Sequence, residues 1–202
     1  MSIREPYVAN FKKVSLVQFK KDMLKYFGDY LKGAYTNEAA IDNFIQLVYD
    51  NIKIPTRSTY GAAGYDFYLP YNVPLKKKDN YAIIPTGIKC EINQGYALVL
   101  VPRSSAGIKQ GFKLRNTIGI IDSDYYNNKD NEGHIMIACQ LDSYPLSEEN
   151  KAKAFSDYMF TPALYENIRL VQGLLIPYGV AINDEDNDTI SERQGGTGST
   201  GV

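Results

Sequence analysis

Residues 119–125, with the sequence GIIDSDY, decide how the rest of the chain is interpreted. Ile120 and Ile121 are a β-branched pair that favours a strand, so Asp122 stands where that strand ends. A carboxylate in such a place can act as a general base for a water molecule, and Tyr125 offers a flat ring to a bound sugar. The alternative is an ordinary turn, because Asp-Ser-Asp before two asparagines is common loop chemistry. The stretch alone leaves both interpretations open.

The composition excludes several classes of protein. A chain of 202 residues suits one domain, or one domain with a sizeable insertion. A formal net charge of -1 argues against a protein that holds nucleic acid by bulk electrostatics. No apolar run approaches the roughly 18 residues of a membrane span, and the start of the chain is too polar for a signal peptide. With one His and no CxxC pair, Cys90 and Cys139 are expected to be reduced core residues rather than zinc ligands. We therefore expect a cytoplasmic protein with no nucleic-acid or membrane partner.

Two amphipathic helices are expected near the N-terminus, after a first strand within Tyr7–Val14. Ser15, with Gln18 three residues later, fits a capping box that begins the first helix, and Gly33 ends it. The second helix is expected over Asn37–Asn51. Both helices carry an apolar stripe, which favours packing against the core or another subunit. Docking of a partner protein is the open alternative.

Beyond Ile52, short β-type runs are separated by Gly, Pro and Asn, which predicts an all-β barrel or jelly roll. Strands are expected at Gly64–Tyr68, Tyr81–Ile84, Ile88–Ile92, Tyr96–Val101, Thr117–Ile121, His134–Leu141, Leu170–Pro177 and Gly179–Ile182. The polar segment Asp142–Thr161 suits a short helix inserted in a loop. The glycine-rich end, Arg193–Val202, cannot pack into a core, and its composition alone favours a frayed tail.

Five stretches each hold groups suited to a nucleotide. Residues 61–66 offer small side chains for close backbone approach, and Asp66 offers a carboxylate for a hydrated magnesium ion. Residues 102–107 supply Arg103, hydroxyls and turn N–H groups for phosphate oxygens. The amide of Asn116 has a donor and an acceptor for one edge of a pyrimidine, and Gln172 places another amide on a strand. The terminal GGTGSTG can fold over phosphates, because glycine allows close approach and the hydroxyls donate.

The ordered series AAGYD, PRSS, GIIDSDY, RLVQ and GGTGSTG resembles the five motifs of the trimeric dUTP pyrophosphatases (dUTPases), from about Ile52 to the C-terminus. The run PRSSAGIKQGFKLRNTIGIIDSDYYNN resembles a branch found in Gram-positive bacteria and their phages, which also carries helices inserted after the first strand. The resemblance implies a single all-β, jelly-roll-like dUTPase domain over residues 1–202, with a helical insertion at about 15–51 and a C-terminal arm at about 190–202. It also implies a homotrimer whose subunits share each active site, the arm crossing to a neighbour.

The same resemblance implies hydrolysis of dUTP to dUMP and pyrophosphate, with magnesium assisting attack of water on the α-phosphate. Asp122 would activate that water, and Asp66 would contact magnesium through water. The residues implied for the base and deoxyribose are Asn116, Gly119, Ile121 and Tyr125, with the Tyr125 ring leaving no room for a 2′-hydroxyl. The residues implied for the phosphates are Arg103, Ser104, Ser105, Gln172, Arg193, Gly198, Ser199 and Thr200.

The sequence departs from the family pattern in its arm. Thr197 stands where the family usually has a Phe or His that caps the uracil, and the spacing from Arg193 to Gly195-Gly196 is one residue shorter than the commonest form. Three other interpretations stay open. A dCTP deaminase shares the fold but needs a catalytic Glu, which Thr117–Tyr126 lacks. A regulatory binding module would dock a protein through the helical insertion, and an inactive paralogue is the interpretation that Thr197 suggests.

Overall fold

The computed structural model describes residues 7–76, 81–141, 158–159 and 166–184. Four of the predicted phosphate ligands, Arg193, Gly198, Ser199 and Thr200, lie outside the described residues, as does Thr197. The helix expected within Asp142–Thr161 also falls outside them, apart from Tyr158–Met159, which form the short strand β10.

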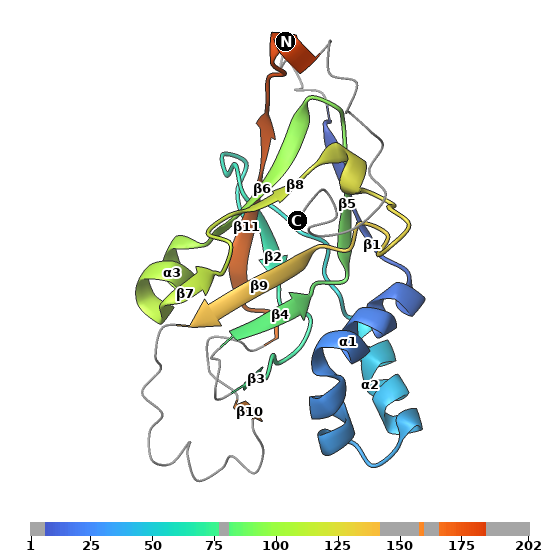
Figure 1. Ribbon diagram of the computed structural model, residues 1–202. Coiled ribbons are helices and arrows are strands. Elements are labelled where there is room, and N and C mark those ends of the chain that lie inside the picture. The colour runs from blue at the N-terminus through green and yellow to red at the C-terminus, as the bar shows by residue number, and fades with distance from the viewer. Residues whose placement is uncertain (1–6, 77–80, 142–157, 160–165, 185–202) are drawn as a thin grey trace.

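The strands of the described structure all pair in antiparallel fashion (Figure 1). The larger sheet has the order β2-β11-β6-β8, formed by Tyr65–Tyr68, Arg169–Pro177, Tyr96–Pro102 and Gly119–Ile121. The second sheet has the order β4-β9-β7, formed by Tyr81–Pro85, Met136–Leu141 and Phe112–Leu114. Two further pairs join β1 (Ala9–Lys13) to β5 (Ile88–Ile92), and β3 (Leu75–Lys76) to β10. The predicted all-β class with an N-terminal helical insertion is confirmed.

A helical hairpin of α1 (Leu16–Ala34) and α2 (Glu38–Asp50) connects β1 to β2. The predicted cap of α1 forms, because the Ser15 hydroxyl accepts a hydrogen bond from the Gln18 backbone N–H at 3.1 Å. The other half of the expected capping box does not form. The Gln18 side chain donates instead to Asp22, and the Ser15 backbone N–H donates to Glu132. The start of α1 is therefore tied both to its own second turn and to a distant loop.

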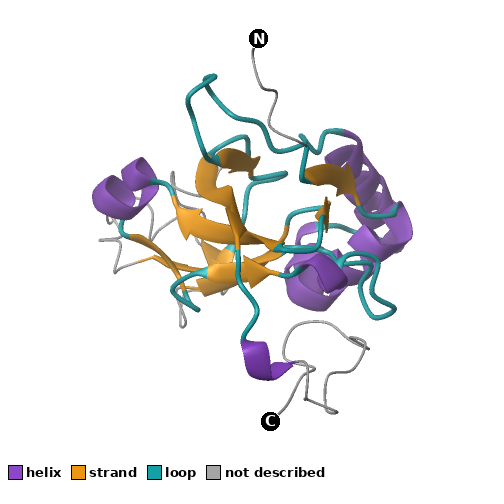
Figure 2. Ribbon diagram, turned by 90° about the horizontal axis from the view of Figure 1, so that it is seen from above, coloured by secondary structure: helices purple, strands orange, loops and turns teal. Residues whose placement is uncertain are grey.

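The hairpin packs against the sheets on the side opposite the short helix α3 (Ser104–Gln110), as the two views show (Figures 1 and 2). Its buried side chains join one hydrophobic cluster with those of the strands; they are Phe19, Met23, Phe27, Leu31, Ile41, Ile45 and Val48. Burial of each large apolar side chain stabilises the fold by about 1.5–3 kcal/mol. The predicted packing role of both stripes is confirmed, whereas partner docking through the hairpin stays a prediction.

Two sequence predictions about local structure are wrong. Gly179–Ile182 is not a strand: β11 ends at Pro177, and Ile182–Asp184 form a 3-10 helix, η3. Val180 and Ile182 are 71% and 90% exposed, so their alternation does not mark a buried strand face. The Pro102–Gly107 stretch, expected to be a turn, instead leads into α3. Within the described ranges, no helix combines the length and apolar character needed to cross a bilayer.

Candidate active site

Asp66 is the centre of a charged cluster at one end of the larger sheet. Only 3% of this residue is exposed, on β2, where it pairs with Gln172 of β11. One carboxylate oxygen accepts from Arg103 Nε at 2.9 Å. The other accepts from Arg169 Nη1 at 3.0 Å and from the Ser58 hydroxyl at 2.8 Å. Two guanidinium groups around one carboxylate leave a net positive charge, which suits phosphate oxygens.

The donors around Asp66 also bear on its predicted magnesium role. An ionised carboxylate has about four lone-pair positions, so three donors leave room for one metal-bound water. Magnesium in nucleotide sites is usually held by one or two carboxylates together with substrate phosphates, and one buried Asp fits that pattern. No cluster of three or more His, Cys, Asp or Glu side chains occurs in the described part of the chain. The residues present therefore fit a metal bound mainly by the nucleotide.

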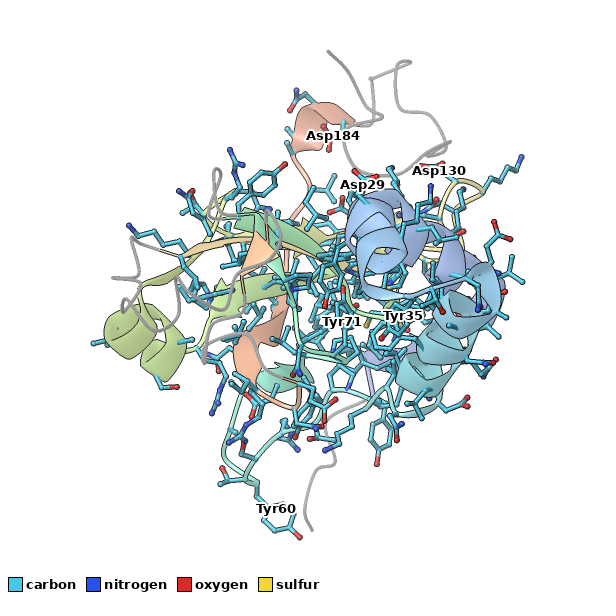
Figure 3. All side chains as sticks on the ribbon, turned by 90° about the horizontal axis from the view of Figure 1, so that it is seen from below. Asp29, Tyr35, Tyr60, Tyr71, Asp130 and Asp184 are labelled. Atoms are coloured by element: carbon cyan, nitrogen blue, oxygen red, sulfur yellow. The ribbon has the colours of Figure 1, made fainter. Side chains whose placement is uncertain are left out.

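Sequence reasoning did not assign two members of this cluster. Arg169 begins the RLVQ stretch, and its Nη1 also donates to Ser58 Oγ at 3.2 Å. Ser58 stands 111 residues before Arg169, in the loop that precedes β2. In the sequence, the signal for Arg169 was its charge within a motif already recognised, and Ser58 had no signal. That loop extends to Tyr60, which is fully exposed and points away from the rest of the molecule (Figure 3).

The backbone around the cluster is closely packed. A Cβ atom placed on Gly64 would lie 2.5 Å from Gln172 Oε1, so glycine is needed for the amide to take this position. Ser104 and Ser105 are exposed in the first turn of α3, directly after Arg103. The first, second and fourth sequence motifs therefore meet in one chain, as the strand register requires.

The third motif forms a separate group. β8 begins at Gly119 rather than Thr117, which has a left-handed backbone with φ of 65°. Asp122 is exposed and follows β8 directly, and the chain then enters the 3-10 helix η1 (Ser123–Tyr125). The stretch is thus both a strand end and a turn, and the two sequence interpretations are each correct in part. Asn116 is exposed before β8, Gly119 is buried against Leu100, and Ile121 is half-buried.

The side chain of Tyr125 is fixed by two hydrogen bonds to its hydroxyl. Its hydroxyl donates to the His134 backbone carbonyl at 3.0 Å and accepts from Asn131 Nδ2 at 2.8 Å. The residue is 6% exposed, so only a small part of the ring surface is open to a ligand in this structure. A ring fixed at both hydrogen-bonding positions of its hydroxyl has one orientation, which is what a rigid platform for a sugar requires.

The strand register separates the two groups within one chain. β8 pairs with β6 so that Ile121 is opposite Leu98 and Gly119 is opposite Leu100. Arg103 follows Leu98 by five residues, which corresponds to roughly 16 Å along an extended strand at about 3.3 Å per residue. Asp122 therefore lies beside the start of β6, while the arginine cluster lies beyond its end. Within the described part of one chain, Asp122 therefore does not lie next to Arg103, the predicted phosphate ligand that follows β6.

Comparison with known proteins decides the family. A model of the dUTPase family matches residues 50–137. The deoxyuridine 5'-triphosphate nucleotidohydrolase of Lactococcus lactis subsp. lactis (strain IL1403) is 38% identical over 151 residues, which are 75% of this chain and 89% of the relative. This chain belongs to the dUTPase family. A second relative with the same description, from Herminiimonas arsenicoxydans, is 35% identical over 153 residues, covering 74% of this chain and 89% of that protein.

Two solved dUTPase structures share the fold of this chain. The crystal structure of dUTPase from Streptococcus mutans aligns with a TM-score of 0.52 and 28% identity, over 85% of this chain and 98% of that one. A point mutant of the Staphylococcus bacteriophage 80alpha dUTPase, with dUpNHpp, aligns with a TM-score of 0.50 and 23% identity, over 77% and 96% of the two chains. The mostly antiparallel dUTPase fold that the sequence predicted is confirmed.

Proposed function

We propose that this dUTPase hydrolyses dUTP to dUMP and pyrophosphate by attack of a water molecule that Asp122 activates. The activity itself follows from the family, because the two relatives described above are deoxyuridine 5'-triphosphate nucleotidohydrolases. The assignment of Asp122 as the general base rests on one observation. Asp122 is the exposed carboxylate at the end of β8, three residues before the fixed ring of Tyr125. A water on Asp122 would therefore lie close to a nucleoside on that ring.

The chemistry requires neutralisation of the phosphate charge before the water attacks. A nucleoside triphosphate carries about four negative charges, which repel a nucleophile unless cations or donors offset them. Arg103, fixed by Asp66, and the exposed hydroxyls of Ser104 and Ser105 would bind the phosphate oxygens. Magnesium, contacted through water by Asp66, would add further charge neutralisation. Asp122 would orient the water toward the α-phosphorus and accept its proton as pyrophosphate leaves.

We also propose that the site is complete only in a homotrimer. Two observations support this: the separation of Asp122 from Arg103 within one chain, and an apolar outer face on the larger sheet. Val99 pairs with both Ile120 and Leu174, so these side chains share one face, where Ile120 is 58% exposed. Val99 and Leu174 are half-buried, so the three side chains form a contiguous apolar patch, the kind of surface at which chains associate. Contact between copies along this face would bring Asp122 of one chain toward the arginine cluster of another.

Pyrophosphate release from dUTP, dCTP, dTTP and UTP tests the proposal. Asp122→Asn keeps the side-chain shape but removes the proton acceptor, so turnover of dUTP should fall by about 10²–10⁴-fold while dUMP binding persists. Asp124→Asn is the matched control, since Asp124 is also exposed and lies two residues away. Near-normal turnover in Asp122→Asn would remove this residue from the mechanism. Release of ammonia from dCTP, with no release of pyrophosphate from dUTP, would favour the deaminase-like alternative.

A further inference from the structure

The loop that follows Tyr125 is supported from behind by the helical hairpin. We call residues 126–134 the Tyr125 loop. The Ser15 backbone N–H donates to Glu132 Oε2 at 2.9 Å, and Lys21 Nζ donates to the Asp130 carbonyl at 3.1 Å. Asp130 lies on the side of the molecule that carries α1 (Figure 3). The third contact joins Asp22 Oδ2 to His134 Nδ1 at 2.6 Å, across 112 residues of sequence.

The Asp22–His134 contact is fully enclosed, and its hydrogen bonds fix the proton positions. His134 is 0% exposed and Asp22 is 4% exposed. The Gly87 backbone N–H donates to His134 Nε2 at 2.7 Å, so that nitrogen carries the lone pair. The ring proton therefore sits on Nδ1 and is donated to the Asp22 carboxylate, which also accepts from Gln18 Nε2 at 2.7 Å. The imidazole is neutral and has a partner on each nitrogen.

The backbone of the same histidine holds Tyr125. Its carbonyl accepts the Tyr125 hydroxyl, and Asn131, whose side chain donates to that hydroxyl, accepts the His134 backbone N–H through its own carbonyl at 2.9 Å. Asp22 fixes the His134 ring, the ring fixes the residue, and the residue fixes the tyrosine. A series of hydrogen bonds therefore runs from the second turn of α1, through His134, to the proposed nucleoside platform.

We propose that Asp22 is a positioning residue for sugar selection, acting through His134 on the Tyr125 ring. The inference rests on the proposed function, in which that ring excludes a 2′-hydroxyl. It gives the inserted hairpin a role in the reaction of its own subunit, in addition to packing. Without an acceptor at residue 22, a buried Nδ1–H would have no partner, and the histidine would turn to find one. The hydroxyl of Tyr125 would then lose its fixed acceptor.

The test compares kcat/KM for dUTP with kcat/KM for UTP in matched variants. Asp22→Leu removes the acceptor and should lower the dUTP/UTP ratio by about tenfold or more. Asp22→Asn keeps an acceptor for Nδ1 and should restore the ratio to within about threefold of wild type. Tyr125→Phe removes the hydroxyl that His134 accepts and should lower the ratio as Asp22→Leu does. The double variant should then show little further loss, because both changes break the same series of contacts.

Leu31→Ala is the control for general loss of stability. Leu31 is buried in α1 and takes no part in the contacts with the Tyr125 loop, so its variant should unfold more easily while keeping the wild-type ratio. An equal fall in the ratio for Leu31→Ala, or no fall in folded Asp22→Leu, overturns the inference. Should Asp22→Leu fail to fold, an unchanged ratio in Tyr125→Phe overturns it as well.

One further variant separates this inference from the function on which it rests. If Tyr125→Ala leaves the ratio unchanged, the sugar role of Tyr125 is wrong and both proposals fail. If Tyr125→Ala lowers the ratio and Asp22→Leu does not, only the role of Asp22 fails.

The single histidine of the chain allows a direct measurement that needs no turnover. In tag-free protein labelled with ¹⁵N-histidine, long-range ¹H–¹⁵N spectra should show the Nδ1–H tautomer of His134 in the wild type and in Asp22→Asn. Asp22→Leu should lose that signature, or show a mixture of tautomers. Addition of dUMP to the wild type should shift the His134 signals. The nucleoside would contact the ring of Tyr125, whose hydroxyl donates a hydrogen bond to the His134 carbonyl. The inference is contradicted if wild-type His134 carries its proton on Nε2, or if the His134 signals do not shift when dUMP is added.

Discussion

Gly133 is the position at which one added methyl group should test the Tyr125 platform most directly. Its φ is 77°, in the left-handed region, and a Cβ there would lie 2.6 Å from the Tyr125 carbonyl oxygen and 2.9 Å from the Tyr126 Cα. Both neighbours are backbone atoms, so neither can move without displacing η1. An L-residue in this conformation costs roughly 1–2 kcal/mol. Overpacking adds about 1–3 kcal/mol, so Gly133→Ala should lose about 2–5 kcal/mol of unfolding free energy.

Gly95→Ala provides the matched control. Gly95 has a similar φ of 88°, but nothing lies within 4 Å of a Cβ placed there, so only the conformational cost of about 1–2 kcal/mol should appear. Urea unfolding measures both losses, and the dUTP/UTP ratio should fall only in Gly133→Ala. Equal losses of stability, together with an unchanged ratio in Gly133→Ala, would refute the argument that this glycine sets the place of Tyr125.

Three other perturbations follow from contacts described above. Ile120→Asp places a charge on the apolar outer face, so light scattering should give the mass of a monomer and turnover of dUTP should be lost. Gly64→Ala should displace the Gln172 amide and raise KM for dUTP several-fold, by steady-state assay, with little change in urea stability. The pKa of Asp22 is lowered even though burial favours a rise, because His134 and Gln18 donate to the carboxylate; the pKa of Glu132 is lowered likewise by Ser15 and Lys89. Their contribution to stability is full above their ordinary pKa values and is lost as the pH falls through the lower folded values. Urea unfolding from about pH 6 to about pH 3 should therefore show less acid destabilisation in Asp22→Asn/Glu132→Gln than in the wild type.

The elements that the sequence predicted well are those with a local signal. Ser15 and Asn37 cap helices whose apolar period continues for several turns, and α1 and α2 follow within a residue or two of the expected ranges. Ile88–Ile92 was predicted at its observed bounds, because apolar and charged residues alternate there between turns. The short helix α3 was missed, since it contains Gly107 and no side chain caps it. Val180 and Ile182 misled the prediction because apolar alternation does not reveal whether a partner strand exists.

The residues of the site likewise divide into those with a local sequence signal and those without one. Asp122 was placed correctly at a strand end because the preceding isoleucines indicate the strand. The contacts that fix the site could not be predicted, since they join residues distant in sequence. Asp66 meets Arg169 across 103 residues, and Asp22 meets His134 across 112. Whether a histidine supports a loop or stands alone depends on which helix packs over it, and that is a property of the fold.

The two buried cysteines, Cys90 and Cys139, allow local unfolding to be followed by alkylation of the native chain. Burial raises the pKa of Cys90 and of Cys139 to about 12, so at pH 8 only about one thiol in ten thousand is ionised in the folded protein. Cys90 pairs with Phe11 in the two-stranded β1–β5 sheet, whereas Cys139 lies in β9 between β4 and β7. Alkylation at Cys90 should therefore record separation of the N-terminal strand, and alkylation at Cys139 should record unfolding of the sheet interior. Peptide mass spectrometry after a timed pulse of iodoacetamide would follow both events in one sample, without any introduced label.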